Sequence, residues 1–264
     1  MRRALAITIA AAAALSLAAG CDSETTTAEG PPPAVPSSSS PAAATGSPSQ
    51  PAPAPTVSSV PAMPEPKRKL KTGLKGADVL ALQQRLTELG YWNGKADGRF
   101  GSTTQQAVYA VQKAAGINRD GTVGPKTQKA LTEGVRPEAR STTGTLVEID
   151  LKRQLLLLVT DGRVTQTFNT STGSNEYYEQ EGQTYRADTP RGRFKVGRQI
   201  DGWRNAPLGL LWRPKYFNGG IAVHGAPSVP PYPASHGCAR VSVAAMNWLW
   251  KNDAIPLKTR VWVY

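Results

Sequence analysis

The sequence contains few of the residues on which disulfide-rich and histidine-rich proteins depend. Only two cysteines and two histidines occur among its 264 residues. Two cysteines allow one disulfide at most, which excludes a disulfide-rich scaffold. Hydrophobic residues make up 39% of the chain. This fraction is low for a fully globular protein and indicates that part of the chain does not fold.

Acidic residues are also scarce. The 31 Lys and Arg residues outnumber the 19 Asp and Glu residues, which gives a formal net charge of +12. Arg2 and Arg3 are the only basic residues before Lys67, so the positive charge belongs to the rest of the chain. A basic folded part favours a polyanionic partner. Nucleic acid is one such partner, but an export signal argues against it and favours a cell wall rich in anionic groups.

The first 21 residues have the order of an export signal. Arg2 and Arg3 precede an apolar stretch over residues 4–19, and Gly20-Cys21 follows. This ending resembles a bacterial lipobox, which implies lipidation of Cys21 and a lipoprotein on the outer face of the cytoplasmic membrane. The alternative is ordinary cleavage that leaves Cys21 free. A lipid on Cys21 and a catalytic role for Cys238 account for both cysteines without a disulfide.

Residues 22–66 consist mostly of Pro, Ser, Ala and Thr. They hold too few apolar side chains to offset the entropy lost on ordering, so we predict a disordered spacer. Proline-rich chains extend by about 3.1 Å per residue, so this spacer would span roughly 140 Å. We interpret it as a tether from the membrane into the wall. A linker with no role beyond separation is the alternative.

A small helical domain is predicted for residues 67–134. Gly90 stands where a first helix would end, and the apolar face of that helix comprises Val79, Leu82, Leu86 and Leu89. Two Asp-Gly turns, at Asp97 and Asp120, each open a further helix and form an internal repeat. The segments LQQRLTELGYWNG, DGRFGSTTQQAV and DGTVGPKTQKAL resemble the peptidoglycan-binding-domain-1 family. The resemblance implies a three-helix bundle that binds wall glycan or stem peptide.

A mainly β, sandwich-like domain is predicted for residues 144–264, after a polar hinge over 135–143. Strand patterns occur at 145–150 and 154–159, and an Asp-Gly hairpin turn follows the second. A short helix is expected over 243–250 and a closing strand over 261–264. The polar insert after Gly173 contains three tyrosines. We interpret it as a lid over a binding site or as a long loop.

The stretch from Ile221 to Arg240 holds both histidines and Cys238. A short apolar strand leads to His224, and a proline-rich loop can return the chain so that Cys238 lies near it. A thiol attacks a carbonyl as the thiolate, and a nearby imidazole either lowers its pKa or takes its proton. The backbone N–H groups of Gly237 and Cys238 are candidates to hold an oxyanion.

These residues resemble the active-site signature of the YkuD-type L,D-transpeptidases, in the run from Ser235 to Arg240 (SHGCAR) with His224-Gly225 upstream. The resemblance implies a cysteine acyltransferase that needs no cofactor and forms 3→3 cross-links between stem peptides of bacterial peptidoglycan. By position, Cys238 matches the family's nucleophile and His224 its base. Ser235 and His236 are expected to orient the site. Arg240 is expected to support the loop or to bind a carboxylate.

Other functions remain open at this point. His224, His236 and Cys238 are zinc-ligand types, so a zinc-dependent carboxypeptidase on stem peptides is one alternative, although no carboxylate in the motif can serve as its base. A cysteine carboxypeptidase and a wall-binding lipoprotein without catalysis are two more. We expect no metal and no obligate protein partner, and we expect the helical domain to deliver substrate without doing chemistry. Weaker candidates for substrate contact are four aromatic residues, namely Tyr91, Trp92, Trp212 and Tyr216.

Overall fold

The computed structural model describes residues 68–264, which belong to one compact unit of the chain. The predicted export signal with Cys21 and the predicted spacer over 22–66 lie outside the described residues. No helix within residues 68–264 is long and apolar enough to span a membrane.

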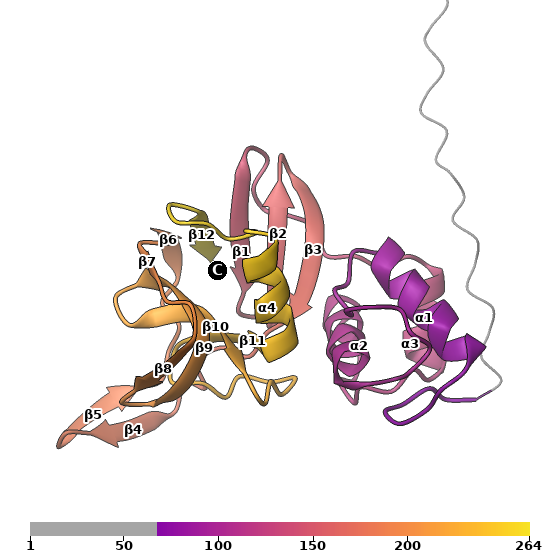
Figure 1. Ribbon diagram of the computed structural model, residues 1–264, viewed down its shortest axis with the longest axis horizontal. Helices are drawn as coiled ribbons and strands as arrows, with labels where there is room; N and C mark the ends of the chain where they lie inside the picture. The colour runs from indigo at the N-terminus through magenta and orange to yellow at the C-terminus, as the bar shows by residue number, and fades with distance from the viewer. Residues whose placement is uncertain (1–67) are drawn as a thin grey trace, which may run out of the picture. The chain divides into compact units, whose positions relative to one another are not determined.

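The first part of the described chain is helical (Figure 1), with helices α1 (Ala77–Glu88), α2 (Ser102–Ala114) and α3 (Pro125–Thr132). The predicted apolar face of the first helix is buried, as the low exposure of Val79, Leu82 and Leu86 indicates. Gly90 follows α1 with a φ of 75°, a backbone conformation that glycine adopts at little cost. The predicted three-helix arrangement is confirmed.

A buried glutamine side chain accounts for the internal repeat. Gln83 in α1 donates from Nε2 to Asp97 Oδ1 over 3.0 Å, and its Oε1 accepts the N–H of the following glycine over 2.8 Å. Gln112 in α2 makes the corresponding contacts with Asp120 Oδ1 and the next N–H, over 2.7 and 2.9 Å. Each Asp-Gly turn is therefore fixed by an amide group that is nearly inaccessible to solvent.

The rest of the chain is mainly β, as predicted, and contains two five-stranded sheets. The first has the order β3-β2-β1-β12-β6, with strands β1 (Thr145–Asp150), β2 (Leu155–Thr160), β3 (Arg163–Asn169), β6 (Gly192–Lys195) and β12 (Arg260–Val263). The second has the order β11-β10-β9-β7, with β8 also paired to β9; its strands are β7 (Arg198–Gln199), β8 (Trp203–Ala206), β9 (Gly209–Asn218), β10 (Ile221–Ala226) and β11 (Ala239–Ser242). The polar insert forms a separate hairpin of β4 (Tyr177–Gln180) and β5 (Gln183–Arg186).

One apolar core joins the two sheets to helix α4 (Val243–Lys251), which packs on β9, β10 and β11 of the second sheet (Figure 1). Ser242 caps this helix, because its Oγ accepts the N–H of Ala245 over 3.1 Å. The cluster takes residues from the first sheet, the second sheet and the helix, among them Val147, Leu156, Val223, Val241 and Met246.

Strand β2 is apolar on both of its faces, and both faces are covered. Leu156 and Leu158 point into the core between the sheets. Leu155, Leu157 and Val159 instead join the apolar cluster of the helical part. A strand covered on both sides is typically a continuous apolar run rather than an alternating one. The helical part therefore shares a core with the β part.

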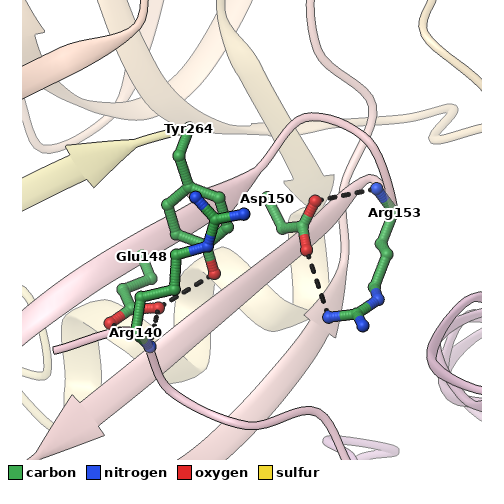
Figure 2. A network of polar contacts seen from close by, with 5 residues as sticks. All are labelled: Arg140, Glu148, Asp150, Arg153 and Tyr264. Atoms are coloured by element: carbon green, nitrogen blue, oxygen red, sulfur yellow. Dashed lines mark hydrogen bonds and ion pairs between the residues drawn. The ribbon is translucent and has the colours of Figure 1, made fainter.

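The segment predicted as a hinge is tied to the first sheet by a buried carboxylate (Figure 2). Glu148 in β1 is inaccessible to solvent and accepts the backbone N–H of Arg140 over 3.0 Å and that of Ser141 over 2.7 Å. The Tyr264 hydroxyl donates to the same carboxylate over 2.9 Å, and the Arg140 guanidinium lies 3.8 Å from the Tyr264 ring centroid. Burial and the Glu148 charge raise the pKa of Tyr264. These contacts fix the end of the segment nearest β1.

Candidate active site

His224 and Cys238 are brought together by two parallel strands. Strand β10 carries His224, and β11 begins at Ala239, directly after Cys238; the pairing register sets Val223 against Ala239 and His224 against Arg240. Side chains alternate between the faces of a strand. Val223 and Ala239 therefore enter the core, while His224, Cys238 and Arg240 line a cavity of about 800 Å³.

Cys238 is a free cysteine whose sulfur lies close to the backbone of the preceding strand. The N–H of Ala222 points at Sγ over 3.4 Å, and Sγ lies 3.8 Å from the carbonyl oxygen of Gly220. Burial raises the pKa of the Cys238 thiol, and the Ala222 N–H and the Arg240 charge only partly oppose this. The resting group is therefore a thiol near neutral pH.

His224 is 4% exposed, and its Nδ1 lies 2.9 Å from the carbonyl oxygen of Gly225. A carbonyl oxygen can only accept a hydrogen bond, so Nδ1 carries the proton and Nε2 keeps its lone pair. Burial lowers the pKa of His224 to about 4; the hydrogen bond to Gly225 opposes this shift, and the nearby Arg240 charge adds to it. The imidazole is thus a neutral base at the pH where Cys238 is a thiol. Of the two sequence-based options, this geometry favours proton transfer to the imidazole over a preformed thiolate.

Ser235 and Thr189 hold the turn that leads into Cys238. Ser235 Oγ accepts the N–H of Gly237 over 3.0 Å and donates to the carbonyl oxygen of Cys238 over 2.6 Å. Thr189 Oγ1 donates to the Gly237 carbonyl over 2.6 Å and accepts the N–H of Gly173. The Gly237 N–H is therefore already engaged, which argues against its predicted oxyanion contact and leaves the Cys238 N–H as the remaining candidate. Thr189 was not identified as a site residue from the sequence.

Gly237 has a φ of 138°, and a Cβ added there would lie 2.8 Å from the carbonyl oxygen of Asp188. Both observations require glycine at this position. A Cβ on Gly173 would lie 2.3 Å from the Ala187 carbonyl oxygen, so the segment after β3 approaches the same region of backbone closely. Close packing of the backbone near the thiol therefore explains why Gly173 and Gly237 are glycines.

The tyrosine-bearing insert borders the cavity. Tyr178 and Arg186 of the β4–β5 hairpin line the cavity. The ring of Tyr178 meets the exposed ring of His236 edge-on, with centroids 4.8 Å apart, and stacks on Tyr185 at 5.7 Å. His236 therefore packs against the hairpin and also lines the cavity. The insert, which the sequence predicts as a lid or a long loop, is a hairpin that forms one wall of the cavity.

The four aromatic candidates for substrate contact separate into different environments. Tyr216 lines the cavity, and the Arg198 guanidinium lies 3.8 Å from its ring centroid. Trp212 packs against Trp203 and donates from Nε1 to Asn247 Oδ1 over 2.7 Å. Trp92 is partly buried and stacks on Phe168 with centroids 5.8 Å apart.

Tyr91 is a correction to the sequence-based assignment. It is 1% exposed, and its hydroxyl donates to the Val135 carbonyl over 2.8 Å. It is a core residue and is not accessible to a ligand. Aromatic residues in small helical bundles serve the core as readily as a ligand site, and the sequence alone does not separate the two roles.

Arginines dominate the charge of the cavity lining, a feature that sequence reasoning did not identify. Four arginines line the cavity, namely Arg186, Arg198, Arg204 and Arg240. Asp188 is the one acidic residue among the lining residues. Arg240 belongs to the SHGCAR motif. The other three lie in strands β5, β7 and β8, outside any motif that the sequence offers. Among residues 68–264, no three side chains of the His, Cys, Asp and Glu types are placed to hold one metal ion.

Residues 144–263 match the family of L,D-transpeptidase catalytic domains (YkuD), and residues 75–131 match a peptidoglycan binding domain family. The crystal structure of an L,D-transpeptidase fragment from Xylanimonas cellulosilytica is 58% identical, with a TM-score of 0.73; the match covers 76% of this chain and 100% of that one.

Curated relatives match over a shorter stretch. A probable N-acetylmuramoyl-L-alanine amidase of Bacillus licheniformis is 45% identical over 80 residues, which are 29% of this chain and 23% of the amidase. The spore cortex-lytic enzyme of Bacillus subtilis is 44% identical over 63 residues, 24% of this chain and 21% of that enzyme. The chain therefore spans less than a quarter of the length of these two relatives.

Proposed function

The chain belongs to the L,D-transpeptidase family, and on that premise we propose that it is a cysteine acyltransferase that forms 3→3 cross-links in peptidoglycan. The domain organisation given above, with a wall-binding helical domain before a catalytic β domain, is part of this proposal. Cys238 is the nucleophile and His224 the base. The reaction passes through a thioester between Cys238 and a stem peptide.

In the first half-reaction, His224 Nε2 takes the proton of the Cys238 thiol as Sγ attacks the carbonyl carbon of the third stem residue. A carbon–sulfur bond forms, and the carbonyl oxygen becomes an oxyanion that the Cys238 N–H stabilises. The tetrahedral intermediate collapses with loss of the terminal D-amino acid. Its leaving amine takes the proton from the imidazolium, so the half-reaction ends with a thioester and a neutral His224.

In the second half-reaction, an amine of a neighbouring stem attacks the thioester carbonyl. His224 takes a proton from this amine, a new amide bond forms and the carbon–sulfur bond breaks. The departing sulfur takes the proton back as a thiol. Water in place of the amine would give a tripeptide, which is the carboxypeptidase outcome. The product therefore distinguishes the two activities.

The observation that carries this proposal is the hydrogen bond from His224 Nδ1 to the Gly225 carbonyl beside a cavity that Cys238 also lines. It fixes the tautomer whose free lone pair is at Nε2. A neutral thiol and a neutral imidazole form a pair that can exchange one proton in each half-reaction. General base catalysis requires that starting state.

The arginines of the cavity support an anionic substrate. Arg186, Arg198 and Arg204 are exposed, and Arg240 is partly buried. Guanidinium groups bind carboxylates with charge-assisted hydrogen bonds. A stem peptide carries a carboxylate on its terminal D-amino acid. We assign the arginine-lined part of the cavity to the acyl donor.

The location of the enzyme is also proposed. The helical domain would hold the enzyme on wall glycan or stem peptide, as the match of residues 75–131 suggests. Cys21 would anchor the exported chain at the outer face of the membrane, and residues 22–66 would set its reach into the wall. A metal, a nucleic acid and an obligate protein partner have no part in this account.

The proposal is tested by incubating the full chain with soluble tetrapeptide stems as donor and acceptor. Chromatography and mass spectrometry of the products should show release of the terminal D-amino acid and a dimer joined at two third residues. Cys238→Ser should give neither product. A tripeptide without a dimer would replace the transpeptidase assignment by the carboxypeptidase one.

A further inference from the structure

The loop between His224 and Cys238 contains prolines at 227, 230, 231 and 233. Proline has no N–H, so this loop makes few backbone hydrogen bonds of its own, and its carbonyl groups need outside donors. The Val229 carbonyl accepts Gln106 Nε2 over 3.1 Å, and the Pro231 carbonyl accepts Arg119 Nη1 over 3.1 Å. Both donors belong to the helical domain, more than a hundred residues earlier in the chain. The loop beside the thiol is thus held from outside the catalytic domain.

Asn169, at the end of β3, completes this arrangement from the catalytic side. Its Nδ2 donates to the Val229 carbonyl over 3.2 Å and to Gln106 Oε1 over 2.5 Å. The side chains of Gln106 and Asn169 therefore converge on one carbonyl group of the loop. Val229 itself is 5% exposed, so these polar groups are shielded from competing water.

Lys113, which follows Gln106 in α2, binds the side chain of Asn169 and so holds the same contact in place. It is 1% exposed, and its Nζ donates to the carbonyls of Gln154 and Thr170, each over 2.9 Å, and also to Asn169 Oδ1. Three oxygen acceptors match the three N–H groups of an ammonium. Burial, aided by the Arg119 charge, lowers the pKa of Lys113, and the three acceptors oppose this by favouring the charged form. A buried lysine at this position therefore depends on keeping all three acceptors.

The segment that Lys113 holds is bonded directly to the catalytic motif. Thr170 Oγ1 donates to the Arg240 carbonyl over 2.8 Å, and the next residue, Ser171, exchanges two backbone hydrogen bonds with Arg240. The Thr172 carbonyl accepts the N–H groups of Ala234 and Ser235 over 3.0 and 2.9 Å. Helix α2 is thus connected through residues 169–172 to both sides of Cys238.

We propose that the helical domain positions the catalytic loop, with Gln106 and Arg119 as positioning residues for acyl transfer and Lys113 as the buried anchor of the segment that they act on. The inference rests on the proposed transpeptidase function and adds a second role to a domain whose expected role was to deliver substrate. Neither Gln106 nor Arg119 is among the residues that line the cavity. They act through the loop whose first residues, Pro227 and Ser228, line the cavity.

The test compares the full chain with Gln106→Ala/Arg119→Ala and with the matched control Gln105→Ala/Lys126→Ala. Gln105 is the neighbour of Gln106 on α2, and Lys126 is an exposed basic residue of the same domain. One hydrogen bond contributes a factor of about 2 to 10, so loss of two should lower kcat by about 4- to 100-fold. KM for a soluble stem peptide should change less than about 3-fold, and the control should match the wild type in both constants.

Amide hydrogen exchange supplies a readout that does not depend on the reaction. The N–H groups of Ala234 and Ser235 are bonded to the Thr172 carbonyl, and their exchange should accelerate in the double variant but not in the control. Unchanged kcat in the double variant, with or without faster exchange, would overturn the positioning role. If the wild type transfers no acyl group, the proposed function fails, while the exchange data still show whether the helical domain holds the loop.

Discussion

The Nδ1 atom of His224 lies 2.9 Å from the carbonyl oxygen of Gly225, the next residue in the same strand. This contact decides which ring nitrogen can accept a proton, because the bonded nitrogen must be the donor. The pairing of β10 with β11 then puts His224 on the same face as Cys238. Sequence spacing suggested the two residues, and the local backbone geometry leaves on Nε2 the free lone pair that the proposed base requires.

The first prediction concerns the pH dependence of catalysis. Burial lowers the pKa of His224 to about 4 and raises that of Cys238. The acid limb of kcat/KM, which reports the free enzyme, should therefore lie near pH 4 and not near the ordinary histidine value of about 6.5. A pH-rate profile with a soluble donor measures this. An acid limb at pH 6 to 7 would contradict a neutral buried base.

The second prediction is the matching change in stability. The pKa of His224 is lower in the folded than in the unfolded protein, so the unfolded chain binds more protons between the two values. This contribution to the free energy of unfolding is fully present above about pH 6.5 and is lost as the pH falls toward 4. The loss is about 3 kcal/mol at most. Urea unfolding at several pH values should show it in the wild type, and His224→Gln should lack this part of the pH dependence.

The third prediction concerns Gly237. Gly237→Ala should lower the free energy of unfolding by about 1–3 kcal/mol, because the new Cβ needs a strained φ and meets the Asp188 carbonyl. It should also lower activity strongly, since Cys238 is the next residue. Gly197→Ala is the matched control, because its φ is unstrained and no atom lies within 4 Å of the added Cβ. Equal stability and activity of the two variants would rule out the strain argument.

The fourth prediction concerns the buried amine of α2. Lys113→Met keeps the apolar stem but takes one donor from each of three oxygen acceptors. Of these, the Gln154 carbonyl keeps the N–H of Thr170 over 3.2 Å. The free energy of unfolding should fall by roughly 2–4 kcal/mol, as expected for several unsatisfied buried groups. Lys126→Met, at an exposed site, should change it by less than about 0.5 kcal/mol. A similar urea midpoint for both variants would show that Lys113 contributes no more than a surface lysine.

The fifth prediction concerns metal ions. The proposed mechanism takes its nucleophile from sulfur, so activity should persist in an excess of chelator. The assay should include a chelated sample to which zinc is then added back. Loss on chelation with recovery on zinc would favour the zinc-dependent alternative.

Much of the fold follows from local sequence patterns. The face of Val79, Leu82 and Leu86 predicts the first helix, and the apolar run after Gln154 predicts a buried strand; both are confirmed. These patterns suffice because a helix or strand with a buried face has apolar residues that recur at a regular spacing in the sequence. The same reasoning places a helix over 243–250, and α4 spans Val243–Lys251.

The site residues that sequence reasoning missed depend on contacts between distant segments. Lys113 follows a helical pattern that fits a solvated lysine, and only packing of α2 on β3 reveals its buried acceptors. Thr189 donates a hydrogen bond to the Gly237 carbonyl, and only the folded chain brings these two distant residues together. Tyr91 is only a weak ligand candidate from the sequence, because an aromatic residue beside a loop gives the same pattern whether it faces inward or outward.

The most direct test of the central claim is intact-protein mass spectrometry of the full chain mixed with a soluble tetrapeptide stem. The account predicts a covalent adduct with the mass of the tripeptide acyl group, located at Cys238 by peptide mapping. Addition of a stem amine should discharge the adduct and yield a 3→3 dimer. Cys238→Ser should form no thioester and no dimer. Product formation by Cys238→Ser, or turnover by the wild type without an adduct at Cys238 under any quench condition, would contradict cysteine acyl transfer.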